Sequence, residues 1–181
     1  MLLISEEMRQ ANKLLHDRGD YGSRGHRWKA CVDDIMQRGN CQSVLDYGCG
    51  KGGLKAALPQ YDVREYDPAI PGKDALPEPA DLVLCADVLE HVEPELIDNV
   101  LAHIASIAIK FAMLSPSTKA AKKTLPDGRN AHLIVQPASW WRRKFSEHFF
   151  LLQDRDKAGN YTFFGKRIER KHGIYGPGAS C

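Results

Sequence analysis

The spacing of apolar side chains divides this chain into helices that alternate with strands. In some segments apolar residues recur every three or four positions, which is typical of amphipathic helices, and in others they alternate or form short runs, which indicates strands. The expected strands are 43–47, 62–66, 81–86, 110–114, 149–153 and 161–166. The expected helices are 5–15, 28–36, 54–58, 94–104 and 136–145. This order predicts an α/β domain with a parallel sheet that ends in an antiparallel hairpin, with the first helix on the outside of the sheet.

The second and third expected strands are joined by a short segment. Only thirteen residues separate Asp67 from Asp81, and four of them are prolines. A parallel crossover needs at least about 10–12 residues with its helix, and proline breaks helix interiors. We therefore expect a sheet of six strands with 62–66 at its edge and 69–79 extended beside the site. That segment, the N-terminal arm or the second subunit of a homodimer must then cover the open edge.

The strongest local signal is VLDYGCGKGG at 44–53, where four glycines follow the first expected strand. Glycine permits left-handed backbone and close approach of a ligand, and the start of the next helix offers free N–H groups. A dinucleotide site has the spacing G-x-G-x-x-G, whereas this chain has G-x-G-x-G with Asp46 just before it. A carboxylate there repels a pyrophosphate and suits a ligand that bears an ammonium group. A tight turn without a ligand is the alternative interpretation.

Two further stretches lie at matching distances from this loop. Residues 63–67 alternate and end in Asp67, and 80–92 have the sequence ADLVLCADVLEHV. With the loop, they resemble the class I S-adenosylmethionine-dependent methyltransferases over roughly residues 21–167. The resemblance implies a Rossmann-like, doubly wound sheet, mostly parallel with a C-terminal antiparallel hairpin, whose second helix and third strand are reduced or missing. It also implies methyl transfer as the activity and S-adenosyl-L-methionine as the cofactor.

The resemblance also assigns residues to the methyl donor. In this family the acid that ends the second strand holds the ribose hydroxyls, which indicates Asp67. An acid in a segment such as 74–77 accepts from the adenine amine, which indicates Asp74. The expected donor site comprises Tyr21, Asp46, Gly48, Cys49, Gly50, Gly52, Asp67, Pro68, Asp74, Ala75, Asp87 and Val88.

Transfer from a sulfonium mainly requires that donor and acceptor be held in line. A base is needed only for a protonated acceptor, and His132 and Asp87 are the expected catalytic residues. The loop at 16–26 is expected to fold over the donor, although its composition suits an exposed linker equally well. The residues expected to bind the acceptor are His26, His91, Arg129, Asn130 and Trp141. The alternative is that they pack in the fold or anchor a surface loop.

Charge is distributed unevenly along the chain. Residues 110–181 contain 14 Lys and Arg against 5 Asp and Glu, whereas 1–109 contain 11 against 18. A basic half indicates an anionic acceptor, unless it only solvates a surface. DNA-base methylation is disfavoured, because Ala86-Asp87-Val88-Leu89 stands where those enzymes have an Asn/Asp-Pro-Pro-aromatic turn, and no Pro-Cys occurs. We expect a small-molecule or anionic acceptor, and a compact RNA or nucleotide stays open.

The 181 residues and 43% hydrophobic content fit one methyltransferase domain, expected over 1–172, with a disordered tail at 173–181. Residues 1–40 would form a helical segment and a loop over the site. No window resembles a membrane span. The five cysteines show no CxxC pair, which predicts reduced thiols in a cytoplasmic protein and no metal site. Two other functions stay open: a non-catalytic S-adenosylmethionine-binding or scaffold protein, and an NAD-dependent oxidoreductase, which the glycine spacing disfavours.

Overall fold

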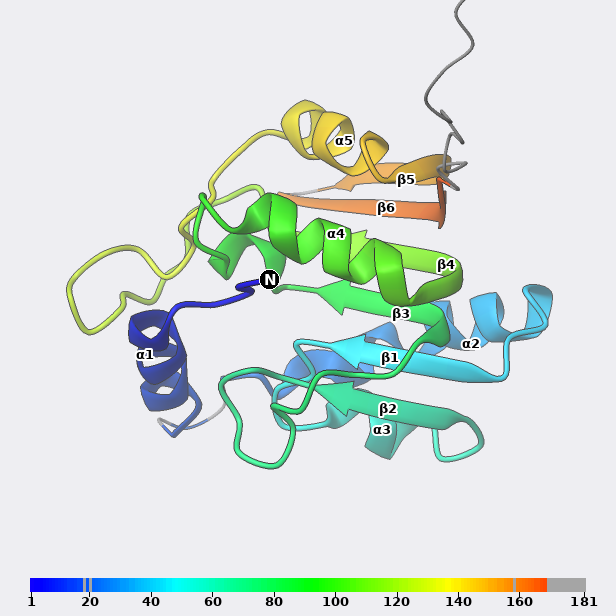
Figure 1. The fold of residues 1–181 in the computed structure, drawn as a ribbon, viewed down its shortest axis with the longest axis horizontal. Coiled ribbons are helices and arrows are strands. Elements are labelled where there is room, and N and C mark those ends of the chain that lie inside the picture. The colour runs from blue at the N-terminus through cyan, green and yellow to red at the C-terminus, as the bar shows by residue number, and fades with distance from the viewer. Residues whose placement is uncertain (18, 20, 158, 169–181) are drawn as a thin grey trace, which may run out of the picture.

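A six-stranded sheet forms the centre of the protein, with the strand order β2-β1-β3-β4-β6-β5 (Figure 1). The computed structural model describes residues 1–17, 19, 21–157 and 159–168, and the tail expected at 173–181 lies outside them. β1 is parallel to β2 and β3, β3 is parallel to β4, and β6 is antiparallel to β4 and β5. The predicted fold class is therefore confirmed. The strands are β1 (Ser43–Tyr47), β2 (Asp62–Tyr66), β3 (Ala80–Ala86), β4 (Ala108–Ser115), β5 (Phe149–Lys157) and β6 (Asn160–Arg167).

Helices cover both faces of this sheet. In Figure 1, α4 and α5 lie in front of the strands, and α2 and α3 lie behind them. Because both faces are covered, adjacent residues of one strand enter different cores: Val44 packs on the α2 side and Leu45 on the α4 side. No helix in the described part of the chain has the length and hydrophobicity that a bilayer crossing requires. The helices are α1 (Glu6–Asp17), η1 (Arg24–Trp28), α2 (Lys29–Arg38), α3 (Gly53–Ala57), η2 (Leu89–His91), α4 (Ile97–Ile107) and α5 (Ala138–Ser146).

Helix α1 lies beyond the carboxyl ends of the parallel strands (Figure 1). Its buried residues Met8 and Leu15 pack with Leu125 and Ala131, which belong to the long loop between β4 and α5. The first helix therefore lies outside the sheet, as expected, and its apolar side chains contact this loop. The helix and the loop together form a wall above the carboxyl edge of the sheet.

The segment between β2 and β3 (67–79) contains neither helix nor strand, and all of its residues are described. No described strand pairs outside β2, so the shortened sheet is as predicted. The expectation that 69–79 is extended is wrong for its first half, where Ile70 N donates to Asp67 O (3.2 Å) and Lys73 N donates to Ile70 O (3.0 Å). These turns bend the chain because Pro71-Gly72 favours a turn over an extended path. Charged side chains on the short β2 blunt its open edge.

Candidate functional site

The loop after β1 alternates left-handed glycines with other residues. The angle φ is +80° at Gly48, +51° at Gly50 and +79° at Gly52, values that residues with a side chain rarely adopt. A Cβ atom on Gly48 would lie 2.3 Å from Val88 Cγ2, and one on Gly50 would lie 2.4 Å from Gly22 O. Glycine is thus required both by the backbone conformation and by the two segments that pack onto the loop.

Hydrogen bonds fix this loop to the end of β2. Gly48 N donates to Tyr66 O (2.7 Å), and Gly50 N donates to Asp67 Oδ2 (3.1 Å). The other oxygen of this carboxylate accepts from Ala69 N (3.0 Å). Two backbone donors therefore hold the Asp67 carboxylate in one orientation next to the glycine loop.

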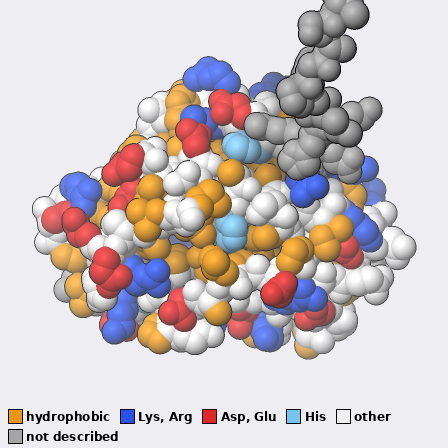
Figure 2. Space-filling model, viewed as in Figure 1, with side chains coloured by type: hydrophobic (Ala, Val, Ile, Leu, Met, Phe, Trp, Pro, Cys, Tyr) orange, Lys and Arg blue, Asp and Glu red, His pale blue; other side chains and the backbone are white. Residues whose placement is uncertain are grey.

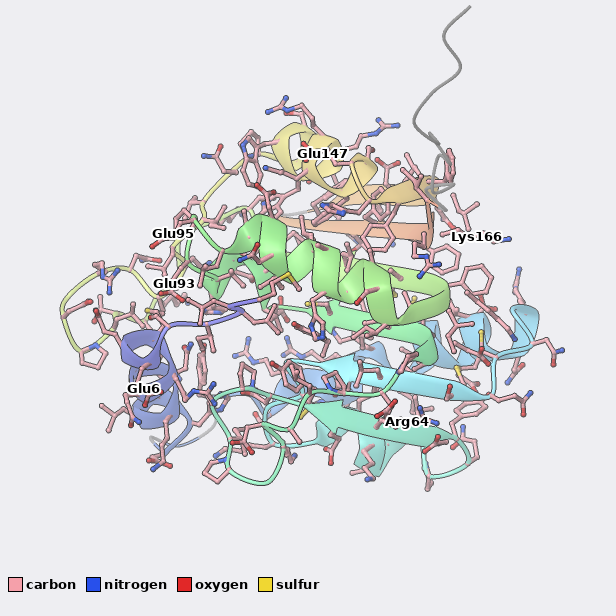
Figure 3. The ribbon with its side chains drawn as sticks, viewed as in Figure 1. Glu6, Arg64, Glu93, Glu95, Glu147 and Lys166 are labelled. Atoms are coloured by element: carbon pink, nitrogen blue, oxygen red, sulfur yellow. The ribbon has the colours of Figure 1, made fainter. Side chains whose placement is uncertain are left out.

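The carboxyl ends of the parallel strands open into a cavity of about 600 Å³, which is within the usual range for ligand sites. Helix α1 forms one wall of the cavity. The segment before α1 is held by Glu93 (labelled in Figure 3), which accepts a hydrogen bond from Ser5 N (3.0 Å). Some of the expected site residues line this cavity. The expected residues that line the cavity are Tyr21, Asp46, Gly48, Cys49, Asp67, Pro68, Asp87, Val88, His91 and His132.

Asp46 is the buried acid at the glycine-loop end of the cavity. Its side chain is only 5% exposed, and its Oδ2 has no hydrogen-bond partner among the described residues. Burial, with a contribution from the charge of Glu65, raises the pKa of the Asp46 carboxyl to about 7. A positively charged ligand group would satisfy this oxygen and stabilise the ionised form.

Helix α1 contributes cavity residues that sequence reasoning missed. Met8, Asn12 and His16 all line the cavity, and their spacing of four places them on one helix face. His16 Nε2 lies 3.7 Å from Asp67 Oδ2, and the His16 ring contacts Tyr21 edge-on with centroids 4.8 Å apart. The four-residue spacing was the available signal, but the sequence did not show what that face would contact.

Two acids from the loop after β3 also line the cavity. Asp87 has a positive φ of 56° and faces the cavity, where desolvation raises the pKa of its carboxyl. Glu90 is 1% exposed, and its Oε1 accepts from Ser117 N (2.9 Å), whereas its Oε2 has no partner among the described residues. Burial raises the pKa of the Glu90 carboxyl to about 8. Like Asp46, Glu90 is a buried acid with one unsatisfied oxygen.

Two histidines adjoin these acids. The rings of His91 and His132 meet edge-on with centroids 4.7 Å apart, and His132 Nε2 lies 4.0 Å from Glu90 Oε1. Burial and the neighbouring His132 lower the pKa of His91 to about 4, so His91 is neutral near pH 7. The expected catalytic residues, Asp87 and His132, therefore line the cavity close to each other.

Several expected donor residues lie outside this cavity. Asp74 and Ala75 are exposed, because Asp74 Oδ1 accepts from Gly72 N (3.1 Å) in the turn that shortens the β2–β3 connection. Gly50 lines a smaller cavity of about 220 Å³. Gly52 is the N-cap residue of α3, and a Cβ atom there would meet the Glu65 carboxylate. These placements do not support a donor contact by these four residues.

The expected acceptor residues, apart from His91, also lie outside the cavity. Arg129 is exposed and pairs with Asp127 (2.6 Å) and Glu7 (3.0 Å). Asn130 joins two parts of its own loop through both backbone groups of Ala121. Trp141 is fully buried in the core with Phe145, and His26 is exposed within η1. Each has a structural role, so the structure does not support the expectation that these four residues bind the acceptor.

No family model matches this sequence, and no curated protein matches it. Solved structures do share its fold. A Burkholderia thailandensis 1,6-didemethyltoxoflavin-N1-methyltransferase with bound S-adenosylhomocysteine has 17% identity and a TM-score of 0.62, with 90% of this chain and 88% of that chain covered. A Synechocystis magnesium protoporphyrin IX methyltransferase with bound S-adenosylmethionine has 17% identity and a TM-score of 0.62, covering 93% and 100%.

The N-methyltransferase NodS from Bradyrhizobium japonicum, in complex with S-adenosylhomocysteine, is similar at 12% identity and a TM-score of 0.61, with 91% of this chain and 100% of that chain covered. At such identities the likeness establishes the fold. The chain thus has the class I methyltransferase fold, as the sequence motifs predicted.

The close contact between Gly48 and Val88 predicts a measurable difference between two glycine variants. Gly72 also has a positive φ, +85°, but a Cβ atom there would meet nothing within 4 Å. Gly72→Ala should therefore cost only the left-handed conformation, about 1–2 kcal/mol, whereas Gly48→Ala adds overpacking of about 1–3 kcal/mol. Urea unfolding followed by tryptophan fluorescence measures both losses. Equal losses would show that Val88 does not constrain the loop.

Proposed function

We propose that this protein transfers the methyl group of S-adenosylmethionine to a small, anionic acceptor. The proposal depends above all on the unsatisfied Asp46 Oδ2, which is buried beside the glycine loop at one end of the cavity. S-adenosylmethionine has an ammonium group, which this carboxylate would bind. The volume of about 600 Å³ has room for this donor and part of an acceptor.

The donor would extend from Asp46 across the glycine loop to the end of β2. Its ribose hydroxyls would donate to Asp67, whose carboxylate is already oriented by Gly50 N and Ala69 N. An NAD pyrophosphate suits this end poorly, because the carboxylates of Asp46 and Asp67 would repel it. Titration with S-adenosylhomocysteine and with NAD separates these two ligands.

The acceptor would occupy the opposite end, between Asp87, His132 and the loop after β4. Lys122 and Lys123 of this loop line the cavity, and Lys123 Nζ lies 5.2 Å from the centre of the Tyr21 ring. These cations support an anionic acceptor. A broad anionic polymer has less support, since Figure 2 shows acidic and basic side chains intermingled over the face that it presents.

In the reaction, the acceptor nucleophile attacks the methyl carbon as the bond from carbon to sulfur breaks, and the sulfonium becomes a neutral thioether. The protein contributes mainly by holding both reactants in line. Asp87 and His132 lie where either could receive a proton from the acceptor. Release of labelled methyl groups to pools of small acceptors distinguishes an enzyme from a protein that only binds the donor.

Two aspartates on the same segment provide a test of donor binding. Asp67→Asn removes a charged acceptor of the ribose hydroxyls and keeps the side-chain shape, so S-adenosylhomocysteine should bind about 10- to 100-fold more weakly. Asp74→Asn alters an exposed turn outside the cavity and should bind like the unaltered protein. Isothermal titration measures both, with thermal melts to confirm folding. An unchanged dissociation constant in folded Asp67→Asn would refute the donor site.

The raised pKa of Asp46, about 7, predicts the pH dependence of donor binding. The ionised carboxylate binds the ammonium, so below pH 7 the ligand must displace a proton and its affinity should fall by up to about tenfold per pH unit. Above pH 7 the affinity should level off, until the ligand amine itself loses its proton. Titrations with S-adenosylhomocysteine between pH 5 and pH 8 test this, with Asp46→Asn as the variant that should bind weakly at every pH. A flat profile for the unaltered protein would contradict the role of Asp46.

A further inference from the structure

Three metal-ligating side chains converge at the acceptor end of the cavity. Glu90 and His91 belong to η2, and His132 lies 41 residues further along the chain, in the loop after β4. One potential ligand atom from each lies within 4.8 Å of the others. Such a set, a carboxylate with two imidazoles, is one that zinc and related transition metals bind.

Both imidazoles are oriented as metal ligands are. His91 Nδ1 lies 2.7 Å from Ala131 O, and His132 Nδ1 lies 2.5 Å from Lys119 O. A carbonyl oxygen only accepts, so each Nδ1 carries the proton and donates it. In a neutral ring the lone pair is then on Nε2, which leaves that atom able to coordinate a cation, and backbone carbonyls commonly fix ligating histidines in this tautomer.

Glu90 provides a second, independent observation. Its side chain is 1% exposed, and its Oε2 has no hydrogen-bond partner among the described residues. Among the described residues, no Lys or Arg lies within ion-pair distance of the Glu90 carboxylate. The one basic side chain at that distance in this part of the chain is His132. A buried carboxylate oxygen without a partner is costly, and a bound cation would remove that cost.

We propose that Glu90, His91 and His132 bind one divalent transition-metal ion, of the zinc and cobalt type. Zinc bonds to imidazole nitrogen and carboxylate oxygen at about 2.0–2.2 Å, so small rotations of the two partly exposed histidines would bring the three atoms into coordination range. Magnesium and calcium prefer oxygen ligands and fit this set poorly. Cysteine spacing predicted no metal site, whereas these three ligands come from two segments that are distant in the sequence.

Three protein ligands leave a coordination position open toward the cavity. Resting on the proposed methyl transfer, this position would hold a hydroxyl oxygen of the acceptor and lower its pKa. The hydroxyl proton would pass to Asp87, because His132 would then be a ligand. The new bond joins this oxygen to the methyl carbon as the bond from carbon to sulfur breaks. The acceptor would thus be a hydroxyl compound, methylated on oxygen.

Metal binding can be tested without any acceptor. Untagged protein stripped with chelator and dialysed would be titrated calorimetrically with Zn²⁺, and with Co²⁺ while its visible absorption is recorded. We expect one ion per chain and the cobalt bands of a coordinated site. His132→Gln and Glu90→Gln should each weaken Zn²⁺ binding at least about 100-fold, whereas His26→Gln, an exposed histidine outside the cavity, should bind like the unaltered protein. Mg²⁺ should give no comparable binding.

Thermal melts with and without Zn²⁺ identify any variant that fails to fold, and His91→Gln then serves as the replacement. Absence of Zn²⁺ binding by the unaltered protein, or full retention in folded His132→Gln and Glu90→Gln, would overturn the metal site. Titration of the stripped protein with S-adenosylhomocysteine separates this result from the proposed function. Donor binding without metal binding overturns only the metal site, and metal binding without donor binding supports the site and overturns the methyl-transfer proposal.

Discussion

The structure depends on one steric constraint, the close packing of two segments against the glycine loop after β1. Val88 touches this loop from the β3 side and Gly22 from the N-terminal side, at distances that leave no room for a Cβ atom on Gly48 or Gly50. Because the loop has no side chains at these points, the N-terminal segment can close over the carboxyl edge of the sheet. The cavity lies between the glycine loop, the loop after β3 and the N-terminal segment, so the glycines determine how these three walls are placed.

Two buried acids line that cavity. Asp46 and Glu90 are each almost fully buried, and each keeps one carboxylate oxygen without a partner in the described chain. Burying such groups lowers the stability of the folded state, and perturbed acids of this kind cluster at functional sites. An ammonium group at Asp46 and a metal ion at Glu90 would each supply the missing positive charge, which links the proposed donor and acceptor ends by the same physical reasoning.

Sequence predicted the fold well because local rules determine most of it. The buried run of β1 and the alternating pattern of β2 predicted both strands to the residue, and the prolines predicted the missing third strand. The contiguous glycine motif also located the part of the cavity next to β1. The positions of other expected residues depend on tertiary contacts instead. The turn at Gly72 leaves Asp74 exposed, and Trp141 is buried in the core. Helix α1 places His16 at the cavity. Spacing along a loop does not determine where its side chains point.

The central claim is that this cavity binds S-adenosylmethionine between the glycine loop and the end of β2. A crystal structure of the complex with S-adenosylhomocysteine tests it most directly. The account predicts the ligand amino group within hydrogen-bond distance of the Asp46 carboxylate, the ribose hydroxyls on Asp67, and the sulfur directed toward Asp87 and His132. A ligand bound elsewhere, or bound in this cavity with its amino group away from Asp46, would contradict it.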